Sequence, residues 1–161
     1  SYIYCNIYNM QIINTTNLNE ARKQIQKLKK ENLNETIAVL SQDEEFNRKV
    51  LEIKGINIFI INENLNQKDY MKQRNSGLNE PLCKLAAKND IKIGVQLDEL
   101  VRKEELEKAR SLARLKQNIM LCKKAKTQLI FLGKHIDKRS TQSLLSVLGA
   151  STNQASNSLI Y

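Results

Sequence analysis

The stretch 75-NSGLNEPLCKLAAKNDIKIGVQLDEL-100 contains a turn, a short helix and a strand, in the order of one repeat unit of an α/β protein. Asn79 can cap a helix with Pro81 in its first turn, because a proline there removes an N–H group that has no partner in a helix. The apolar run at 91–97 predicts a buried strand, and Gly94 marks a place where another part of the protein comes close. The stretch therefore predicts a helix followed by a buried strand.

The rest of the chain alternates in the same way between apolar runs and amphipathic segments. We expect strands at residues 2–8, 36–41, 56–61, 91–97 and 128–132, and helices at about 17–32, 43–54, 80–88, 103–126 and 140–148. Continuous apolar strands separated by amphipathic helices are typical of a parallel sheet covered by helices. A complete eight-unit barrel needs at least about 200 residues. For 161 residues we therefore expect a reduced or compact TIM-like (β/α) barrel of six or seven parallel strands with outer helices, or a doubly wound sheet.

Length and composition indicate one domain. A chain of 161 residues with 41% hydrophobic residues suits a single α/β barrel-like domain over residues 1–161, with a polar C-terminal tail at 149–161. It contains no run of about 18 apolar residues, so we expect no membrane association. Its first residues lack the layout of a signal peptide, and we expect a cytoplasmic protein.

The sequence contains few of the residues that build catalytic or metal sites. Cys5, Cys83 and Cys122 are far apart and form no CxxC pair, so we interpret them as core or incidental thiols. His135 is the only histidine, which argues against a metal centre and leaves one weak catalytic candidate. No glycine-rich phosphate loop occurs. We therefore expect no cofactor, no metal and no catalytic residue.

The positive charge is concentrated in one part of the chain. The net charge is +9, and residues 102–139 hold twelve lysine and arginine residues against four acidic ones. Concentrated positive charge favours a polyanionic partner, because each neutralised phosphate releases counterions. The alternative is a solvated, lysine-rich surface from a biased composition. The charge favours binding of RNA or DNA.

Three segments together resemble one known family. The first has a basic residue, Gly-Leu-Asn and the run LCKLAAKN before a strand. The others are the segment at 109–124 and the segment at 129–156 with its Asp-Lys-Arg turn. Together they resemble ribonuclease P protein component 3. This family is the barrel-shaped protein subunit of archaeal and eukaryotic ribonuclease P. The clear resemblance runs from Arg74 to Ser156, and the chain is shorter than the family pattern by about two βα units.

The resemblance implies a function in tRNA processing. In this family the RNA subunit positions metal ions and removes the 5′ leader of precursor tRNA, while the protein subunit does not cleave RNA. The implied partners are ribonuclease P RNA, precursor tRNA and a small RNA-recognition-motif-like protein subunit. Residue by residue, the motifs point to four RNA-binding candidates: Arg74, Lys84, Lys88 and Arg139.

The predicted long helix adds three candidates. Lys103, Arg110 and Arg114 share one stripe by their spacings of seven and four residues. Arginine can grip two phosphate oxygens and lysine offers a point charge, and neither needs a fixed base sequence. For any single one of them, a solvated helix face is the competing interpretation.

Two other functions stay open. A small barrel-type hydrolase or lyase would have its site at the strand ends around His135, Asp137 and Gln96. Asp137 more simply caps a turn. A protein-interaction module would show neither RNA binding nor turnover.

Overall fold

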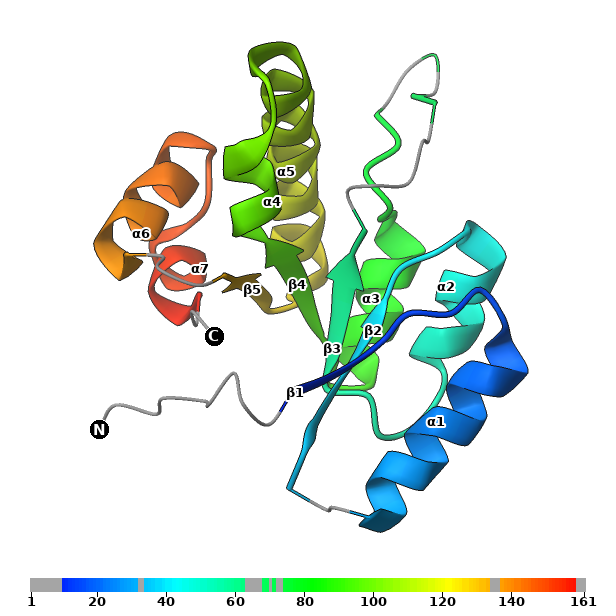
Figure 1. Ribbon diagram of the computed structural model, residues 1–161. Helices are drawn as coiled ribbons and strands as arrows, with labels where there is room; N and C mark the ends of the chain where they lie inside the picture. Colours follow the sequence, from blue (N-terminus) through cyan, green and yellow to red (C-terminus); the bar gives the residue numbers. More distant parts are fainter. Residues whose placement is uncertain are drawn as a thin grey trace.

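Five parallel strands form one sheet in the computed structural model, which describes residues 10–31, 34–62, 68, 69, 71, 74–133 and 137–158. The strands lie side by side in their order along the chain (Figure 1). They are β1 (Met10–Ile13), β2 (Thr36–Leu40), β3 (Ile58–Ile61), β4 (Lys92–Gln96) and β5 (Leu129–Leu132). A doubly wound sheet would reverse its strand order at one point. The sequential order is that of a barrel wall, which confirms the predicted TIM-like α/β fold.

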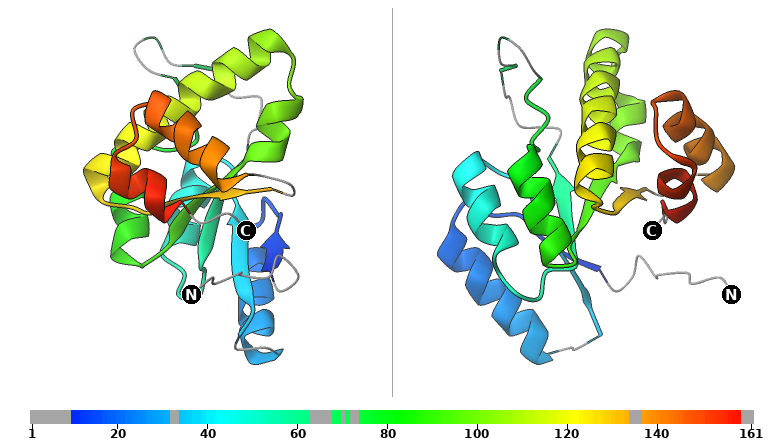
Figure 2. Two further views of the ribbon diagram at one scale, coloured as in Figure 1. Left: turned by 90° about the vertical axis from the view of Figure 1, so that its left-hand side faces the viewer. Right: turned by 180° about the vertical axis from the view of Figure 1, so that it is seen from behind.

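Helices connect the strands and lie on one side of the sheet. The connecting helices are α1 (Leu18–Glu31), α2 (Glu44–Leu51), α3 (Glu80–Lys88), α4 (Leu97–Arg102) and α5 (Glu105–Ala125), and α6 (Lys138–Val147) and α7 (Thr152–Asn157) follow β5. Figure 2, in its view from behind, shows α3 and α5 side by side in front of the sheet. Among the described residues, no helix is long and apolar enough to span a bilayer.

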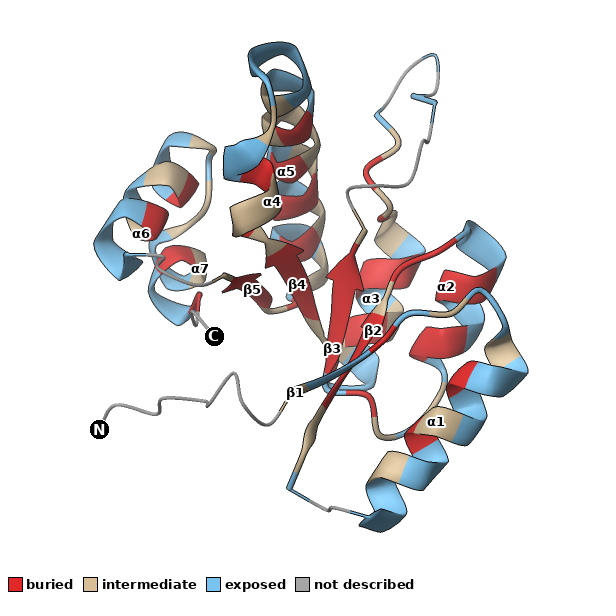
Figure 3. Cartoon of the chain, in the orientation of Figure 1, coloured by how far each residue is buried: buried red, intermediate tan, exposed pale blue. Residues whose placement is uncertain are grey.

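The two faces of the sheet bury different side chains. Figure 3 shows buried residues along the strands and on the connecting helices. The main core contains residues from every helix and from the outer face of the strands, whereas a smaller cluster on the other face consists of strand residues alone. Leu40, Ile60, Gly94 and Ile130 lie in register across that second face. A Cβ atom at Gly94 would lie 2.9 Å from Cγ2 of Ile58, which confirms the predicted close approach. Helices outside and a row of side chains inside are the layers of a barrel wall.

Side-chain caps position the helices as the sequence predicted. Asp43 and Asn79 accept hydrogen bonds from the backbone N–H groups of Phe46 and Leu82, so that α2 and α3 begin where expected. Gly77 has φ +76°, a backbone conformation that favours glycine, in the turn before α3. The turn and helix within residues 75–100 are therefore specified by local sequence signals.

The structure differs from the sequence prediction at three places. The described part of the chain holds five strands, and the predicted strand at 2–8 lies outside it. The predicted helix at 103–126 is confirmed as α5, but a short helix that was not predicted, α4, precedes it and ends at the extended backbone of Lys103 and Glu104. The predicted polar tail contains α7, which begins with a reciprocal capping box between Ser151 and Gln154.

Candidate nucleic-acid interface

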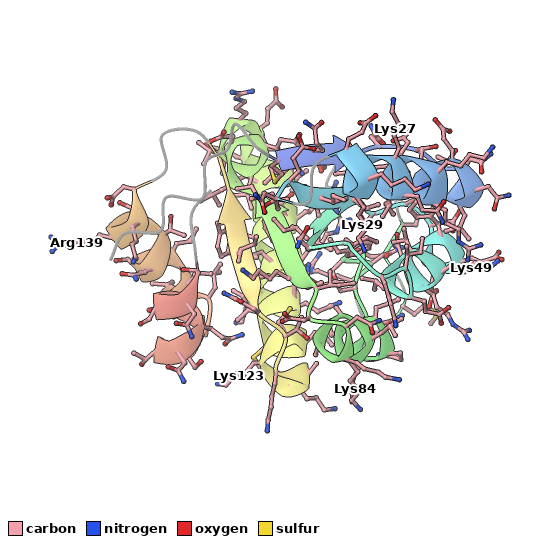
Figure 4. All side chains as sticks on the ribbon, turned by 90° about the horizontal axis from the view of Figure 1, so that it is seen from below. Lys27, Lys29, Lys49, Lys84, Lys123 and Arg139 are labelled. Atoms are coloured by element: carbon pink, nitrogen blue, oxygen red, sulfur yellow. The ribbon has the colours of Figure 1, made fainter. Side chains whose placement is uncertain are left out.

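Cationic side chains project from many elements, but they do not form one uniform surface. Figure 4 shows Lys84 of α3 and Lys123 of α5 on the same side of the molecule, with Lys27 of α1 on the opposite side and Arg139 of α6 apart from both. The helices α3 and α5 carry most of the residues that the sequence singled out. These two helices are therefore the candidate phosphate-binding surface.

Arg74 and Arg114, which are forty residues apart in the chain, meet at the carboxylate of Asp69. Nη1 of Arg74 lies 3.4 Å and Nη2 of Arg114 lies 3.3 Å from oxygens of Asp69. The backbone N–H of Asn75 donates to the same carboxylate, and this hydrogen bond, with the charges of the two arginines, lowers the pKa of Asp69. The cluster has two cations and one anion, so it keeps one net positive charge.

The two arginines differ in their access to solvent. The side chain of Arg74 is 46% exposed, whereas that of Arg114 is 17% exposed. Nε of Arg114 is buried and donates to no acceptor in the described part of the chain. The side-chain amide of Gln117 holds the backbone of Arg74 by two hydrogen bonds: it accepts one from the N–H of Arg74 and donates one to the carbonyl oxygen of Arg74. Arg74 is thus presented to solvent, and Arg114 supports it through Asp69.

A second cluster joins α3 to α5. Glu80 accepts hydrogen bonds from Lys84 at 2.7 Å and from Lys124 at 2.6 Å. These two ammonium groups lower the pKa of Glu80 to about 2, with the hydrogen bond from Lys124 as the largest cause. Lys88, one turn beyond Lys84, is exposed. Cations of two helices therefore lie close together around one carboxylate.

The predicted stripe of Lys103, Arg110 and Arg114 is wrong as a single helical face. Lys103 precedes α5, and its Nζ donates to Oγ of the buried Ser111 at 2.8 Å. Arg110 pairs with Glu107 of its own helix at 2.6 Å. The stripe fails because α5 begins at Glu105, so Lys103 lies outside the helix that carries Arg110 and Arg114. RNA contact by each of them stays a prediction.

The first turn of α6 holds the Asp-Lys-Arg motif. Asp137 accepts hydrogen bonds from the backbone N and from Oγ of Ser140, at 2.7 and 2.8 Å, and these lower its pKa. This confirms that Asp137 caps a turn. The cap leaves Arg139 exposed on the first turn of the helix. His135, the centre of the alternative hydrolase site, lies outside the described residues.

Sequence reasoning did not identify Asp69, Glu80 or Lys124 as members of these clusters. Each owes its role to a contact between distant segments, which leaves no periodic signal in the chain. It also did not foresee that Cys83 and Cys122 are neighbours: both are buried, and a hydrogen bond between their thiols lowers the pKa of Cys83 and raises that of Cys122. Both are core thiols, as predicted, and Cys5 lies outside the described residues.

The chain is similar to a known protein over most of its length. No family model matches the chain. Ribonuclease P protein component 3 of Methanococcus vannielii is 31% identical over 124 residues, which are 77% of this chain and 50% of that protein. The resemblance that the sequence motifs indicated is thereby confirmed. The chain spans about half the length of this curated relative.

A solved structure shares the fold. A chain in the cryo-EM structure of archaeal ribonuclease P with mature tRNA matches with a TM-score of 0.76 at 19% sequence identity. The match covers 92% of this chain and 62% of that chain. At this identity the match establishes the fold alone.

Proposed function

We propose that the protein is an RNA-binding subunit of ribonuclease P, which supports the RNA-catalysed removal of the 5′ leader from precursor tRNA in the cytoplasm. The observation that carries the proposal is its similarity to ribonuclease P protein component 3 over 77% of the chain. The exposed cations of α3 and of the segment before it, Arg74, Lys84 and Lys88, support the proposal, because exposed lysine and arginine side chains can contact phosphates without a fixed base sequence.

In this proposal the protein contributes charge and shape rather than catalytic groups. Two strands of structured RNA repel each other through their phosphates, and a fixed set of ammonium and guanidinium groups lowers that repulsion. Arg74 is held by Gln117 and Asp69, so that little side-chain and backbone freedom is lost when it binds a phosphate. Hydrolysis itself belongs to the RNA subunit, and the protein is not a nuclease on its own.

The proposed partners are the ribonuclease P RNA, precursor tRNA and a small RNA-recognition-motif-like protein subunit. The RNA partners follow from the relatives' names together with the cations of α3 and α5. The protein partner follows from the family resemblance. A stable contact with such a subunit needs a buried area of about 1,200 Å² or more.

Reconstitution tests the proposal. The protein and its small partner subunit are added to the ribonuclease P RNA of the same organism, and 5′ cleavage of a precursor tRNA is measured at low magnesium concentration. We expect stimulated cleavage that disappears when the RNA is omitted. Cleavage that persists without the RNA would contradict the assignment of hydrolysis to the RNA, and no stimulation would contradict the subunit role.

A variant tests the proposed contacts. Replacing Arg74, Lys88 and Arg139 together by alanine should leave the fold intact, because all three side chains are exposed. RNA affinity should fall, and the slope of log K against log salt should become less steep by about 0.9 for each phosphate that the variant no longer neutralises. Unchanged affinity at matched salt would show that the RNA binds elsewhere.

A further inference from the structure

A pocket of about 430 Å³ lies between the C-terminus of α5 and α7, on the N-terminal side of β5. None of the predicted RNA-binding residues lines it. Its polar lining includes Lys123, Lys126, Gln128, Ser151, Asn153 and Asn157. Lys123 points to the same side of the molecule as Lys84 (Figure 4). The pocket therefore lies close to the candidate surface of α3 and α5, at the opposite end of α5 from Arg110.

Hydrogen bonds between distant segments hold the pocket in shape. Nε2 of Gln128 donates to the backbone O of Asn157 at 3.1 Å, and Nε2 of Gln154 donates to the backbone O of Ile119 at 3.1 Å. These contacts fix α7 against β5 and α5. A site with fixed walls binds with less loss of conformational freedom than a mobile surface.

Lys126 has an unusual backbone for a lysine. It ends α5 with φ +59° and ψ +32°, the left-handed conformation in which glycine or asparagine is usual and side chains with a Cβ are disfavoured. The carbonyl groups at the end of a helix favour a cation anywhere in its last turn. This general preference does not explain why a lysine occupies the left-handed position. In the described part of the chain, no acidic side chain pairs with Lys123 or Lys126. Both lysines line the pocket, and neither ammonium group is held by a carboxylate of the described residues.

The other polar groups suit a sugar. The amides of Asn153 and Asn157 lie one helical turn apart on the exposed side of α7, and each amide both donates and accepts hydrogen bonds. A ribose hydroxyl has the same double character, which a deoxyribose lacks at its 2′ position. The pocket thus combines groups for a phosphate with groups for a neighbouring ribose.

We infer that this pocket binds a phosphorylated ribose of an RNA backbone. The inference rests on the proposed function and adds to it a second contact region, beyond the cations of α3 and of the segment before it. An RNA strand that lies along α5 would then contact the protein at Arg74, at Lys84 and at the pocket. The phosphate would lie between Lys123 and Lys126, and the ribose would face Asn153 and Asn157.

The variant Lys126→Gly tests the inference, because glycine suits the backbone conformation while the ammonium group is removed. We expect an unchanged or slightly raised unfolding midpoint. Affinity of the full chain for a short oligouridylate should fall about fivefold, with a salt slope less steep by about 0.7. Lys27→Gln removes the same charge from α1, on the opposite side of the molecule from Lys123 (Figure 4), and should change the affinity by less than about twofold. Equal decreases in the two variants would overturn the inference.

A second comparison tests the ribose contacts. The wild-type protein should bind oligouridylate more tightly than oligodeoxyuridylate, and Asn153→Ala together with Asn157→Ala should reduce that ratio. An unchanged ratio would overturn the assignment of a ribose. Ribose 5-phosphate serves as competitor: weak competition supports RNA as the ligand, and competition as strong as that of the oligonucleotide would show a site for a free sugar phosphate instead.

These outcomes are separate from the reconstitution. If the wild-type protein stimulates cleavage while Lys126→Gly binds RNA no more weakly than Lys27→Gln does, the pocket is refuted and the subunit role stands. If the wild-type protein gives no stimulation, the subunit role fails, and the binding comparison still decides whether the pocket takes a phosphorylated ribose.

Discussion

The α1–α2 side and the α3–α5 side of the molecule are both rich in lysine, but their lysines make different contacts. On α1 and α2, the ion pairs join residues of one helix four positions apart, Lys27 with Glu31 and Lys49 with Glu45. Between α3 and α5, lysines of two helices meet at the single carboxylate of Glu80. The arginines at Asp69 repeat this arrangement between α5 and the segment before α3.

This difference distinguishes ion pairs that a lysine-rich composition alone can produce from clusters that require the tertiary fold. A helix with many lysine and glutamate residues forms pairs four positions apart wherever it lies, and each pair contributes only about 0.3 to 0.5 kcal/mol. Convergence of cations from different elements needs the tertiary fold. A biased composition explains the lysines of α1 and α2, and it does not explain the clusters at Glu80 and Asp69.

Two sets of charge-neutralising substitutions give the sharpest test. Lys84, Lys88 and Lys124 are changed together to glutamine, and the matched control changes Lys27, Lys30 and Lys49 in the same way. Both sets lower the net charge equally. For the first set we expect affinity for ribonuclease P RNA to fall about 100-fold at low salt, since each phosphate that is no longer neutralised costs about fivefold there. In the control set the affinity should fall less than about threefold.

Binding is measured by filter retention or anisotropy over a range of salt concentrations, with circular dichroism to verify the fold of each variant. Equal decreases in the two sets would break the comparison. The positive charge would then act as a diffuse field of the whole protein, and the fold would have no part in selecting the RNA-binding side.

A substitution beneath α3 and α5 separates charge from stability. Gly94→Ala places a methyl group 2.9 Å from Cγ2 of Ile58 on the inner face of the sheet and changes no charge. Overpacking of this kind lowers the free energy of unfolding by about 1–3 kcal/mol. Urea denaturation measures that decrease. RNA affinity at a temperature where the variant is folded should stay within about twofold of wild type. A larger decrease would mean that a small shift of the sheet is enough to displace the RNA-binding cations.

Local sequence signals specified most of the fold but little of the charge clusters. Asp43, Asn79 and Gly77 act through backbone groups within three residues, so their roles are visible in the chain itself. The short helix α4 escaped prediction, and its signal in the sequence is the acidic first turn. The helix α7 had a signal in the Ser151–Gln154 capping box.

The clusters at Asp69 and Glu80 depend on tertiary contacts. Arg114 and Asp69 are 45 residues apart, and Lys124 and Glu80 are 44 apart. No periodicity connects positions at such separations. The family motifs pointed to Arg74 and Lys84 as RNA-binding candidates, which stays a prediction, and such motifs could not tell an exposed arginine from one that supports it. That distinction between Arg74 and Arg114 needs the structure.

The smallest expected effect is on stability, from neutralising the carboxylates of Glu80 and Glu45. Glu80 has a folded-state pKa of about 2 against an ordinary value of 4.5, because two lysines donate to its charged form. A lowered pKa contributes stability that is fully present above pH 4.5 and is lost as the pH falls towards 2. Glu80→Gln should therefore lower the unfolding midpoint at pH 7, and the difference from wild type should shrink between about pH 4.5 and about pH 2.

Glu45→Gln provides the matched case on α2, where one lysine of the same helix is the partner. It should cost about 0.3 kcal/mol at pH 7, the usual value of such a pair, and less than Glu80→Gln does. Both effects diminish with added salt, because exposed pairs are screened. The ratio of the two effects is what matters: a carboxylate that joins two helices holds two parts of the fold together, whereas one that pairs within a helix supports only that helix. If Glu45→Gln were the more damaging change, the contacts between α3 and α5 would be no more than surface pairs, and the side of the molecule assigned to RNA would lose its structural distinction from the other.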